Sequence, residues 1–460
     1  MPADGPRAAQ EAREGSATAV AAIRGAMPEG RDRDPARYPI DGHIPALALA
    51  PRTRGELAGA LQAAARGGLA VAPQAGRTAL AAGGPLHRYD VALDLRGLDR
   101  VVEHEPADLT ITVEAGISLG SLAEVLRPHG QQLPLDPPGG GEVSVGGMLA
   151  TARPGSWRGL LPGVGDLLLG ATVALPDGTL ARSGGRVVKN VAGYDLHRLH
   201  AGALGAFGVI VEAAFKLVPL PEATATIACR CRHLPQAAAL ARTLRDTPLA
   251  ARGLALVGAR AAAEAGLPAE PHVLVGLAGA AAALERSRRE VRLCCRSAHV
   301  PPAEERGDDE TWGRLRALAA GAEAEAGGAE GTPVVLRGSL PLSELAAVLE
   351  EAEEAGFAAW AHIAAGSLLA AAPPSGDAAD AGRVAALRAR CEAAGGTLAI
   401  EAGPAALRAA LDPAAGARDE VALDLARELR RRFDPLRTVN PGRWPLIDGP
   451  GTGAGAAGAA

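Results

Sequence analysis

The 460-residue sequence predicts an α+β protein with two domains. Between residues 51 and 218, stretches with strand and helix periods intermix without a strict strand–helix–strand repeat, which favours α+β over a doubly wound sheet. Turns of small residues separate these stretches at residues 73–78, 143–148 and 202–208. After Pro221 the composition changes, and a second α/β unit is predicted.

The first predicted elements lie between residues 53 and 115. A helix begins at Thr53 and ends at Gly67-Gly68, with apolar residues at helical spacing between them. Short strands are predicted over residues 69–72 and 91–95. In residues 109–115 apolar and polar side chains alternate, which is typical of a half-buried strand.

Further strands and one helix complete the first domain. Gly116 ends the preceding strand, and a helical apolar stripe runs from Leu119 to Leu126. Residues 166–175 and 179–183 predict a hairpin around Pro176-Asp177-Gly178. A last alternating strand covers residues 209–217.

The second unit is predicted to start with a strand, a helix at 234–246 and a strand that ends at 257. Residues 258–332 are rich in Ala, Glu, Arg and Gly, which indicates a surface helical insertion. Strands near 334–340, 358–363 and 397–402, with a helix at 342–355, complete the unit. A final helix at 419–433 leads into a short arm.

The predicted organisation therefore has five parts. They are a disordered segment 1–37, a ligand-binding domain 38–220, a cap or substrate domain 221–425 with the insertion 258–332, a C-terminal arm 426–447 that contacts the first domain, and a disordered Gly/Ala tail 448–460.

Composition excludes several classes of function. A net charge of −5 argues against a nucleic-acid-binding protein, which normally has a basic face. No run of 18 apolar residues predicts a membrane helix, and the charged residues among the first 30 do not predict a secretory signal. The five cysteines show no CxxC spacing, so we expect reduced structural thiols rather than an iron–sulfur or zinc site.

The small-residue turns are the candidate ligand site. Glycine lets main-chain N–H groups approach a bulky anion, so three such turns in order predict one large phosphate-bearing cofactor. Residues 73–78 alone could form an ordinary hairpin turn, and residues 134–147 a proline-rich loop. Neither a GxGxxG nor a GxxxxGK[ST] motif occurs, so the common NAD and ATP signatures are missing.

Other polar residues have open interpretations. Arg186 and Lys189 could bind a carboxylate or phosphate, or could be solvated surface charges. His362 lies in an apolar strand, where a packed core histidine is the commoner outcome than a base or ligand. Zinc-peptidase HExxH and serine-hydrolase GxSxG motifs do not occur.

Several stretches together resemble a known family. They are PQAGRT at 73–78, LPLDPP at 133–138, SVGGMLAT at 144–151, the segment at 184–217 with its VVKNVAGYDL run, and FDPLRTVNPGR at 433–443. These resemble the FAD-binding domain shared by vanillyl-alcohol oxidase and p-cresol methylhydroxylase (the PCMH type). Within that superfamily they resemble in particular the second of the two FAD-binding subunits of bacterial glycolate oxidases.

The resemblance implies an α+β fold in which two subdomains hold FAD, a cap covers the isoalloxazine and a C-terminal arm returns to the FAD domain. It implies a pyrophosphate loop of Pro73, Gln74, Ala75, Gly76, Arg77 and Thr78. It places Pro137, Ser144, Gly146, Gly147 and Thr151 along the flavin, Gly205, Gly208, Val209 and Ile210 near the adenine and ribose, and Asn440 and Arg443 in the arm. Arg77 stands where covalent relatives carry a flavin-linking residue, so non-covalent FAD is expected.

Two departures from the family pattern concern the flavin and the cap. Ala152 replaces an asparagine common in relatives, and the cap reads HIAAGS at 362–367 instead of an HxGDGN-like motif for substrate or metal. No catalytic residue and no metal ligand are therefore assigned.

The resemblance further implies an FAD-dependent oxidoreductase that converts glycolate, a 2-hydroxy acid, to glyoxylate. The expected partners are a second FAD subunit and an iron–sulfur subunit, because this chain lacks cluster cysteines. The expected location is the cytoplasm, with membrane contact only through partners. The degraded cap motif also allows a non-catalytic FAD-binding scaffold, and a stand-alone D-lactate or other hydroxy-acid oxidoreductase is a third interpretation.

Overall fold

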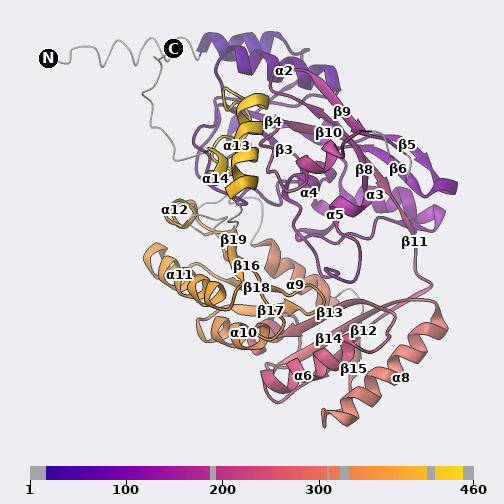
Figure 1. The fold of residues 1–460 in the computed structure, drawn as a ribbon. Coiled ribbons are helices and arrows are strands. Elements are labelled where there is room, and N and C mark those ends of the chain that lie inside the picture. The colour runs from indigo at the N-terminus through magenta and orange to yellow at the C-terminus, as the bar shows by residue number, and fades with distance from the viewer. Residues whose placement is uncertain (1–16, 187–192, 308–309, 322–330, 412–419, 449–460) are drawn as a thin grey trace.

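The computed structural model describes residues 17–186, 193–307, 310–321, 331–411 and 420–448. These residues form two α+β subdomains, a cap built on a large sheet, and a C-terminal arm (Figure 1). The α+β architecture predicted from the sequence is confirmed. Within the described residues, no helix is both long enough and apolar enough to cross a bilayer.

The first subdomain contains a small sheet with strand order β1-β2-β4-β3. Its elements are β1 (Asp32–Arg33), β2 (Leu47–Leu49), α2 (Arg54–Arg66), β3 (Val71–Gln74) and β4 (Val91–Asp94). Strands β2, β4 and β3 are parallel, so the carboxyl ends of β3 and β4 lie at the same edge. Thr53 caps α2, as its side chain accepts a hydrogen bond from the Glu56 N–H.

The second subdomain contains an antiparallel sheet with order β5-β6-β10-β8-β9. The strands are β5 (Val101–Glu105), β6 (Thr110–Glu114), β8 (Leu168–Ala174), β9 (Leu180–Gly184) and β10 (Val209–Lys216), and the helices are α3 (Leu119–Leu126), α4 (Val145–Thr151) and α5 (Val164–Leu167). Strands β7 (Gln131–Gln132) and β11 (Val218–Pro219) pair separately. The predicted hairpin is present as β8 and β9.

The cap is an antiparallel sheet with order β15-β12-β14-β13-β17-β18-β16-β19 in the described residues. The strands are β12 (Ala223–Arg230), β13 (Ala251–Val257), β14 (His272–Gly279), β15 (Glu304–Arg306), β16 (Val334–Ser339), β17 (Ala358–His362), β18 (Ser367–Ala372) and β19 (Thr397–Ala402), and the helices are α6 (Leu234–Arg245), α7 (Ala259–Glu264), α8 (Ala281–Ser297), α9 (Glu310–Ala320), α10 (Leu345–Glu354), α11 (Asp377–Ala393) and α12 (Ala405–Ala410). One sheet face packs against α6, α8, α10 and α11. The other face packs against α7, α9 and Trp157, which lies in the segment between α4 and α5.

The arm consists of α13 (Glu420–Phe433) and α14 (Pro445–Asp448), which lie beside the first subdomain (Figure 1). Its connecting segment joins the edge of the small sheet, because the Val71 N–H donates to Thr438 O and the Asn440 N–H donates to Val71 O. Val439 is fully buried in the core that also holds Leu57 and Leu61. The arm therefore shares one core with the first subdomain.

Three sequence boundaries need correction. Residues 17–25 are helical, and Ile23 and Met27 are buried in the core with α2, so order starts before Tyr38. The stretch 258–332 is no insertion, since β14 pairs with both β12 and β13 inside the cap sheet. Asp448 is buried and pairs with Arg430, so it belongs to the arm. Residues 1–16 and 449–460 lie outside the described residues, as does VVKNVA at 187–192.

Candidate functional site

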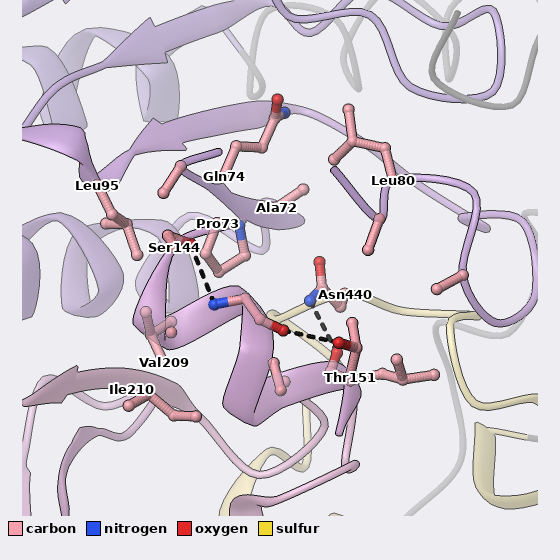
Figure 2. Close-up of a pocket in the computed structure, with 18 of the residues that line it drawn as sticks. Ala72, Pro73, Gln74, Leu80, Leu95, Ser144, Thr151, Val209, Ile210 and Asn440 are labelled. Carbon is pink, nitrogen blue, oxygen red and sulfur yellow. Dashed lines mark hydrogen bonds between the residues drawn. The ribbon is translucent and has the colours of Figure 1, made fainter. Parts of the chain in front are cut away.

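An open cleft of about 910 Å³, counting the space open to solvent, lies in the half of the molecule formed by the two subdomains and the arm. Of the seventeen residues predicted to bind the cofactor, it is lined by fifteen: Pro73, Gln74, Ala75, Arg77, Thr78, Ser144, Gly146, Gly147, Thr151, Gly205, Gly208, Val209, Ile210, Asn440 and Arg443. Figure 2 shows the cleft with Ser144, Thr151 and Asn440 around it. Residues far apart in the chain thus meet at one site.

The loop that follows β3 offers unused hydrogen-bond donors. In the described part of the chain, the N–H groups of Ala75, Gly76, Arg77 and Thr78 donate to no protein acceptor. Arg77 has a positive φ of 57°, and its guanidinium is held by Pro39 O at 3.2 Å and by Arg37 O. Consecutive free N–H groups in such a turn form a concave anion-binding nest.

Gly76, predicted as part of the pyrophosphate loop, does not line the cleft itself. A Cβ at this position would lie 2.1 Å from Glu142 O and 3.1 Å from Ser144 N. The loop therefore packs backbone to backbone against the segment before α4. Glycine is needed here to position the loop, and its contribution to ligand binding is indirect.

The first turn of α4 has its N–H groups satisfied by protein. Val145 N–H donates to Ile117 O, Gly146 N–H to Ala115 O, and Gly147 N–H to Ser144 Oγ at 3.2 Å. A Cβ on Gly146 would approach Ala115 Cβ to 3.0 Å, so this glycine allows α4 to pack closely on β6. Free N–H donors for an anion are therefore found in the loop 75–78, and the N–H groups in the first turn of α4 are already used.

The arm closes the cleft at another side. Asn440 Nδ2 donates to Leu204 O at 2.9 Å (Figure 2), and Arg443 Nη1 donates to Gly84 O at 2.9 Å. Asp41 lies 3.3 Å from Arg443 and also pairs with Arg408 of α12. Burial lowers the pKa of Arg443 to about 10, so its guanidinium stays charged at neutral pH.

The cleft fits a dinucleotide with phosphate groups and a ring system. The loop supplies N–H donors for phosphate oxygens, while Leu95, Val209 and Ile210 supply apolar surface. The Gln74 Oε1 atom is buried without a hydrogen-bond partner in the described residues. The described lining residues include neither histidine nor cysteine, the residues through which a flavin is covalently attached.

Pro137 and Ala152 line a neighbouring cavity and not the cleft, and the contact of Pro137 with the flavin stays a prediction. Asp136 lines this cavity and accepts a hydrogen bond from Ser156 N–H at 2.9 Å. Burial raises the pKa of Asp136 to about 6. Ala152 has a positive φ of 45° at the end of α4, which gives a conformational reason for asparagine at this position in relatives.

The sequence did not predict a charged cluster that lies where the cap sheet meets the loop after α4. Arg153 Nε lies 2.8 Å and Arg337 Nη2 lies 2.6 Å from Glu401 Oε2. Burial would raise the pKa of Glu401, but the two arginines outweigh it and lower the pKa to about 2. These residues lie on β16, on β19 and in the loop after α4, and no local motif connects them.

His362, at the end of β17, lies on the cap sheet near Arg337. Its side chain is 3% exposed, and its Nδ1 atom has no hydrogen-bond partner in the described residues. Burial first, then Arg337 and Arg158, lower its pKa to about 3, so the imidazole is neutral at pH 7. The sequence predicted a packed histidine at this position, and His362 is indeed buried. It did not predict that Nδ1 would lack a hydrogen-bond partner.

Family models match most of the chain. Residues 45–184 match the model described as FAD binding domain, and residues 220–444 match the model described as FAD linked oxidases, C-terminal domain. The second match runs through residues 258–332, in agreement with their place in the cap sheet.

Curated relatives match the chain over shorter stretches. It is 39% identical over 136 residues to "Glycolate oxidase subunit GlcE" of Escherichia coli (strain K12), covering 29% of this chain and 39% of that protein. It is 31% identical over 196 residues to "Glycolate oxidase subunit GlcD" of Bacillus subtilis (strain 168), with 42% of each covered. These matches span less than half of the length of either relative.

Solved structures support the fold. The structure described as p-cresol methylhydroxylase with substrate bound superimposes with a TM-score of 0.75 at 14% identity, covering 94% of this chain and 96% of the other. A 4-ethylphenol oxidase from Gulosibacter chungangensis superimposes with a TM-score of 0.70 at 16% identity, covering 94% and 98%.

Proposed function

We propose that this chain, which belongs to the FAD-linked oxidases of the p-cresol methylhydroxylase type, is the FAD-binding subunit of an enzyme that oxidises a 2-hydroxy acid to the 2-oxo acid. Glycolate is the proposed substrate and glyoxylate the product. The FAD is held non-covalently. The observation that carries the proposal is the loop 75–78, whose N–H groups are free and of which Ala75, Arg77 and Thr78 line the cleft.

The residues of the cleft would divide the binding of FAD between them. The N–H groups of residues 75–78 would hold the pyrophosphate, while Val209 and Ile210 would contact an apolar part of the cofactor. Ser144 and Gly147 fix the first turn of α4, and Asn440 fixes the loop at Leu204. Bound FAD supplies a hydride acceptor, and the protein supplies orientation and a positive environment for the substrate carboxylate.

Partner subunits would complete the reaction path. We propose that electrons pass to an iron–sulfur subunit and that a second FAD-binding subunit belongs to the complex. Two relatives are themselves named as subunits of a glycolate oxidase, which supports an assembly of several chains. The five cysteines of this chain do not supply a cluster motif. We expect the complex in the cytoplasm, with any membrane contact made by a partner.

A titration of the purified full-length chain with FAD tests the first step. We expect binding at micromolar FAD or below, seen as quenched flavin fluorescence and a flavin absorption spectrum that is lost on denaturation, since the cofactor is not covalent. A chain that folds but does not bind FAD would contradict the proposal.

Anaerobic addition of substrate tests the second step. Bleaching of the bound flavin by glycolate supports the proposed reaction. Bleaching by D-lactate in preference to glycolate supports the alternative of a D-lactate oxidoreductase. Relatives that are named D-lactate dehydrogenases are consistent with this alternative. A flavin that responds to neither acid, alone or with its partner subunits, identifies a scaffold subunit.

A further inference from the structure

Four of the five cysteines gather in the cap, where α8 packs on β12. Cys229 lies on β12 and Cys231 follows the last residue of that strand, so the alternation of a strand directs both side chains into the core beneath the helices. Cys294 and Cys295 lie in the last turn of α8. Cys229 and Cys295 are 66 positions apart in the sequence, so only the fold brings these thiols together.

Helix periodicity determines which two thiols meet. On α8 the buried side chains of Leu284, Val291 and Cys295 recur at helical spacing and face the sheet. Cys229 is fully buried and Cys295 is 2% exposed. Their sulfur atoms lie 3.5 Å apart, at hydrogen-bond distance for two thiols. A disulfide needs about 2.05 Å, so the two side chains would have to approach by roughly 1.5 Å.

The other two thiols have partners of their own. Cys231 Sγ donates to Cys229 O at 3.6 Å, and burial raises the pKa of Cys231. Cys294 is half-buried, and its Sγ lies 3.7 Å from Thr247 Oγ1. Cys295 is therefore the thiol that lies against the sulfur of Cys229.

The gathered thiols do not form a metal site. In the part of the chain that the structure describes, no three His, Cys, Asp or Glu side chains are arranged to hold a metal ion. Zinc and iron–sulfur sites need three or four sulfur or nitrogen ligands around one point, whereas here two sulfur atoms meet. The chemistry that this geometry supports is that of a dithiol.

The two thiols of the pair differ in acidity. Their hydrogen bond lowers the pKa of Cys295 against the opposing effect of burial. The same hydrogen bond, together with burial, raises the pKa of Cys229. Cys295 therefore becomes the nucleophilic thiolate more readily, and Cys229 remains a thiol beside it. A reactive thiol next to a second, resolving thiol is the arrangement from which a disulfide forms.

We propose that Cys229 and Cys295 form an oxidisable dithiol site, which hydrogen peroxide converts reversibly to a disulfide between β12 and α8. The Cys295 thiolate would attack one peroxide oxygen, and the O–O bond would break to give a sulfenic acid and hydroxide. The Cys229 sulfur would then attack the Cys295 sulfur, and the S–O bond would break as water leaves with the Cys229 proton. In total, two thiols and one peroxide give one disulfide and two waters. The sulfur atoms lose the two electrons that the peroxide oxygens gain.

The position of the pair predicts the effect of the bond. Strand β12 lies between β15 and β14 near one edge of the cap sheet, and α8 covers it. A bond at this point would tie the end of α8 to the sheet and would restrict the unfolded chain. We expect the oxidised cap to melt about 3–8 °C higher than the reduced cap. Because both sulfur atoms are buried, oxidation should be slow and should require local opening at the end of α8.

Peroxide treatment of the full-length, FAD-loaded chain tests the proposal. The chain is reduced with dithiothreitol, desalted, exposed to a small excess of hydrogen peroxide, and then denatured in N-ethylmaleimide. Of the five cysteines, we expect the two in the disulfide to escape alkylation, and all five to react after renewed reduction. Trypsin separates Cys229, in peptide 217–230, from Cys231, so the unreduced digest should contain peptide 217–230 linked to peptide 293–296.

Matched variants assign the bond to its two sulfur atoms. Cys229→Ala and Cys295→Ala should each abolish the linked peptide. Cys294→Ser should keep it, which distinguishes the two neighbouring thiols of peptide 293–296. Cys391→Ala, a change at a buried cysteine of α11, should also keep it and is the control for a substitution in the core. Oxidation should raise the melting temperature of the wild type and of Cys294→Ser, and not that of Cys295→Ala.

Several results would overturn the proposal. They are alkylation of all five cysteines after peroxide, a link that contains Cys231, loss of the link in Cys294→Ser, and a sulfinic acid at Cys295 without a link. A linked chain whose melting temperature is unchanged would overturn the stabilising effect. FAD affinity should be equal before and after oxidation, because the pair lies outside the cofactor cleft. Failure of the dithiol proposal therefore leaves the proposed function intact.

Discussion

The cofactor cleft and the interdomain cluster place their hydrogen-bond donors by different means. In the cleft, main-chain N–H groups of residues 75–78 are the free donors, and the nearby side chains are mostly small or apolar. In the cluster, the donors are the side chains of Arg153 and Arg337, which both contact Glu401. The donors of the cleft depend on the conformation of the backbone, and the donors of the cluster depend on a few charged side chains.

This difference determines how each site should respond to mutation. A site built from backbone tolerates side-chain changes unless they move the chain. A site built from buried charges responds to the loss of a single carboxylate, because the remaining charges are left without a partner. The following variants test that contrast, from the largest expected effect to the smallest.

Glu401→Gln should have the largest effect. It leaves the guanidinium groups of Arg153 and Arg337 at the domain boundary without their shared carboxylate, and we expect the free energy of unfolding to fall by about 3–5 kcal/mol. Urea unfolding measures this loss. Glu264→Gln, an exposed change on α7, is the matched control and should cost little. A loss similar to that of the control would show that the cluster is not a buried ion network.

Acid should remove the same stabilisation from the wild type. The folded-state pKa of Glu401, about 2, lies below its ordinary value of 4.5, so its contribution is complete above about pH 5 and is lost as the pH falls towards 2. The difference amounts to roughly 3 kcal/mol. Urea unfolding at stepped pH should show a decline in the wild type that is smaller in Glu401→Gln. Parallel pH curves would contradict the assignment.

Gly76→Ala tests the cleft. The added Cβ would meet Glu142 O, a backbone atom, so the loop must shift and the free N–H groups must move with it. We expect FAD to bind at least ~10-fold more weakly, about 1.4 kcal/mol, as measured by fluorescence titration. Gly59→Ala, where no atom lies within 4 Å of the new Cβ, is the control. Unchanged FAD affinity would remove the loop from the binding site.

Ala152→Gly should have the smallest effect and the opposite sign. Ala152 connects the two regions, between Thr151 of the cleft and Arg153 of the cluster, and its φ of 45° is unfavourable for alanine. Glycine should stabilise the chain by about 1 kcal/mol, seen as a raised melting temperature. The same change at exposed Ala123 inside α3 should destabilise by a similar amount. If both substitutions lowered the melting temperature, Ala152 would not be strained.

The sequence was informative about the cleft because its residues lie in short contiguous motifs. Pro73–Thr78 and Ser144–Thr151 each combine turn chemistry with small residues, so local patterns identify them. The error at residues 258–332 has a related cause. Alanine- and glutamate-rich helices α7 and α8 dominate the composition there, and they hide β14, whose place is decided by pairing with β12 and β13.

The sequence by itself determined the α+β class, most elements of the FAD-binding half and the loop that offers N–H groups, because these depend on local periodicity and on glycine. Tertiary structure decided that Val439 completes the N-terminal core and that Gly76 is required by Glu142 O. It alone brought Arg337, His362 and Glu401 to the loop after α4. Burial and long-range ion pairing depend on which strands become neighbours, and no local pattern contains that information.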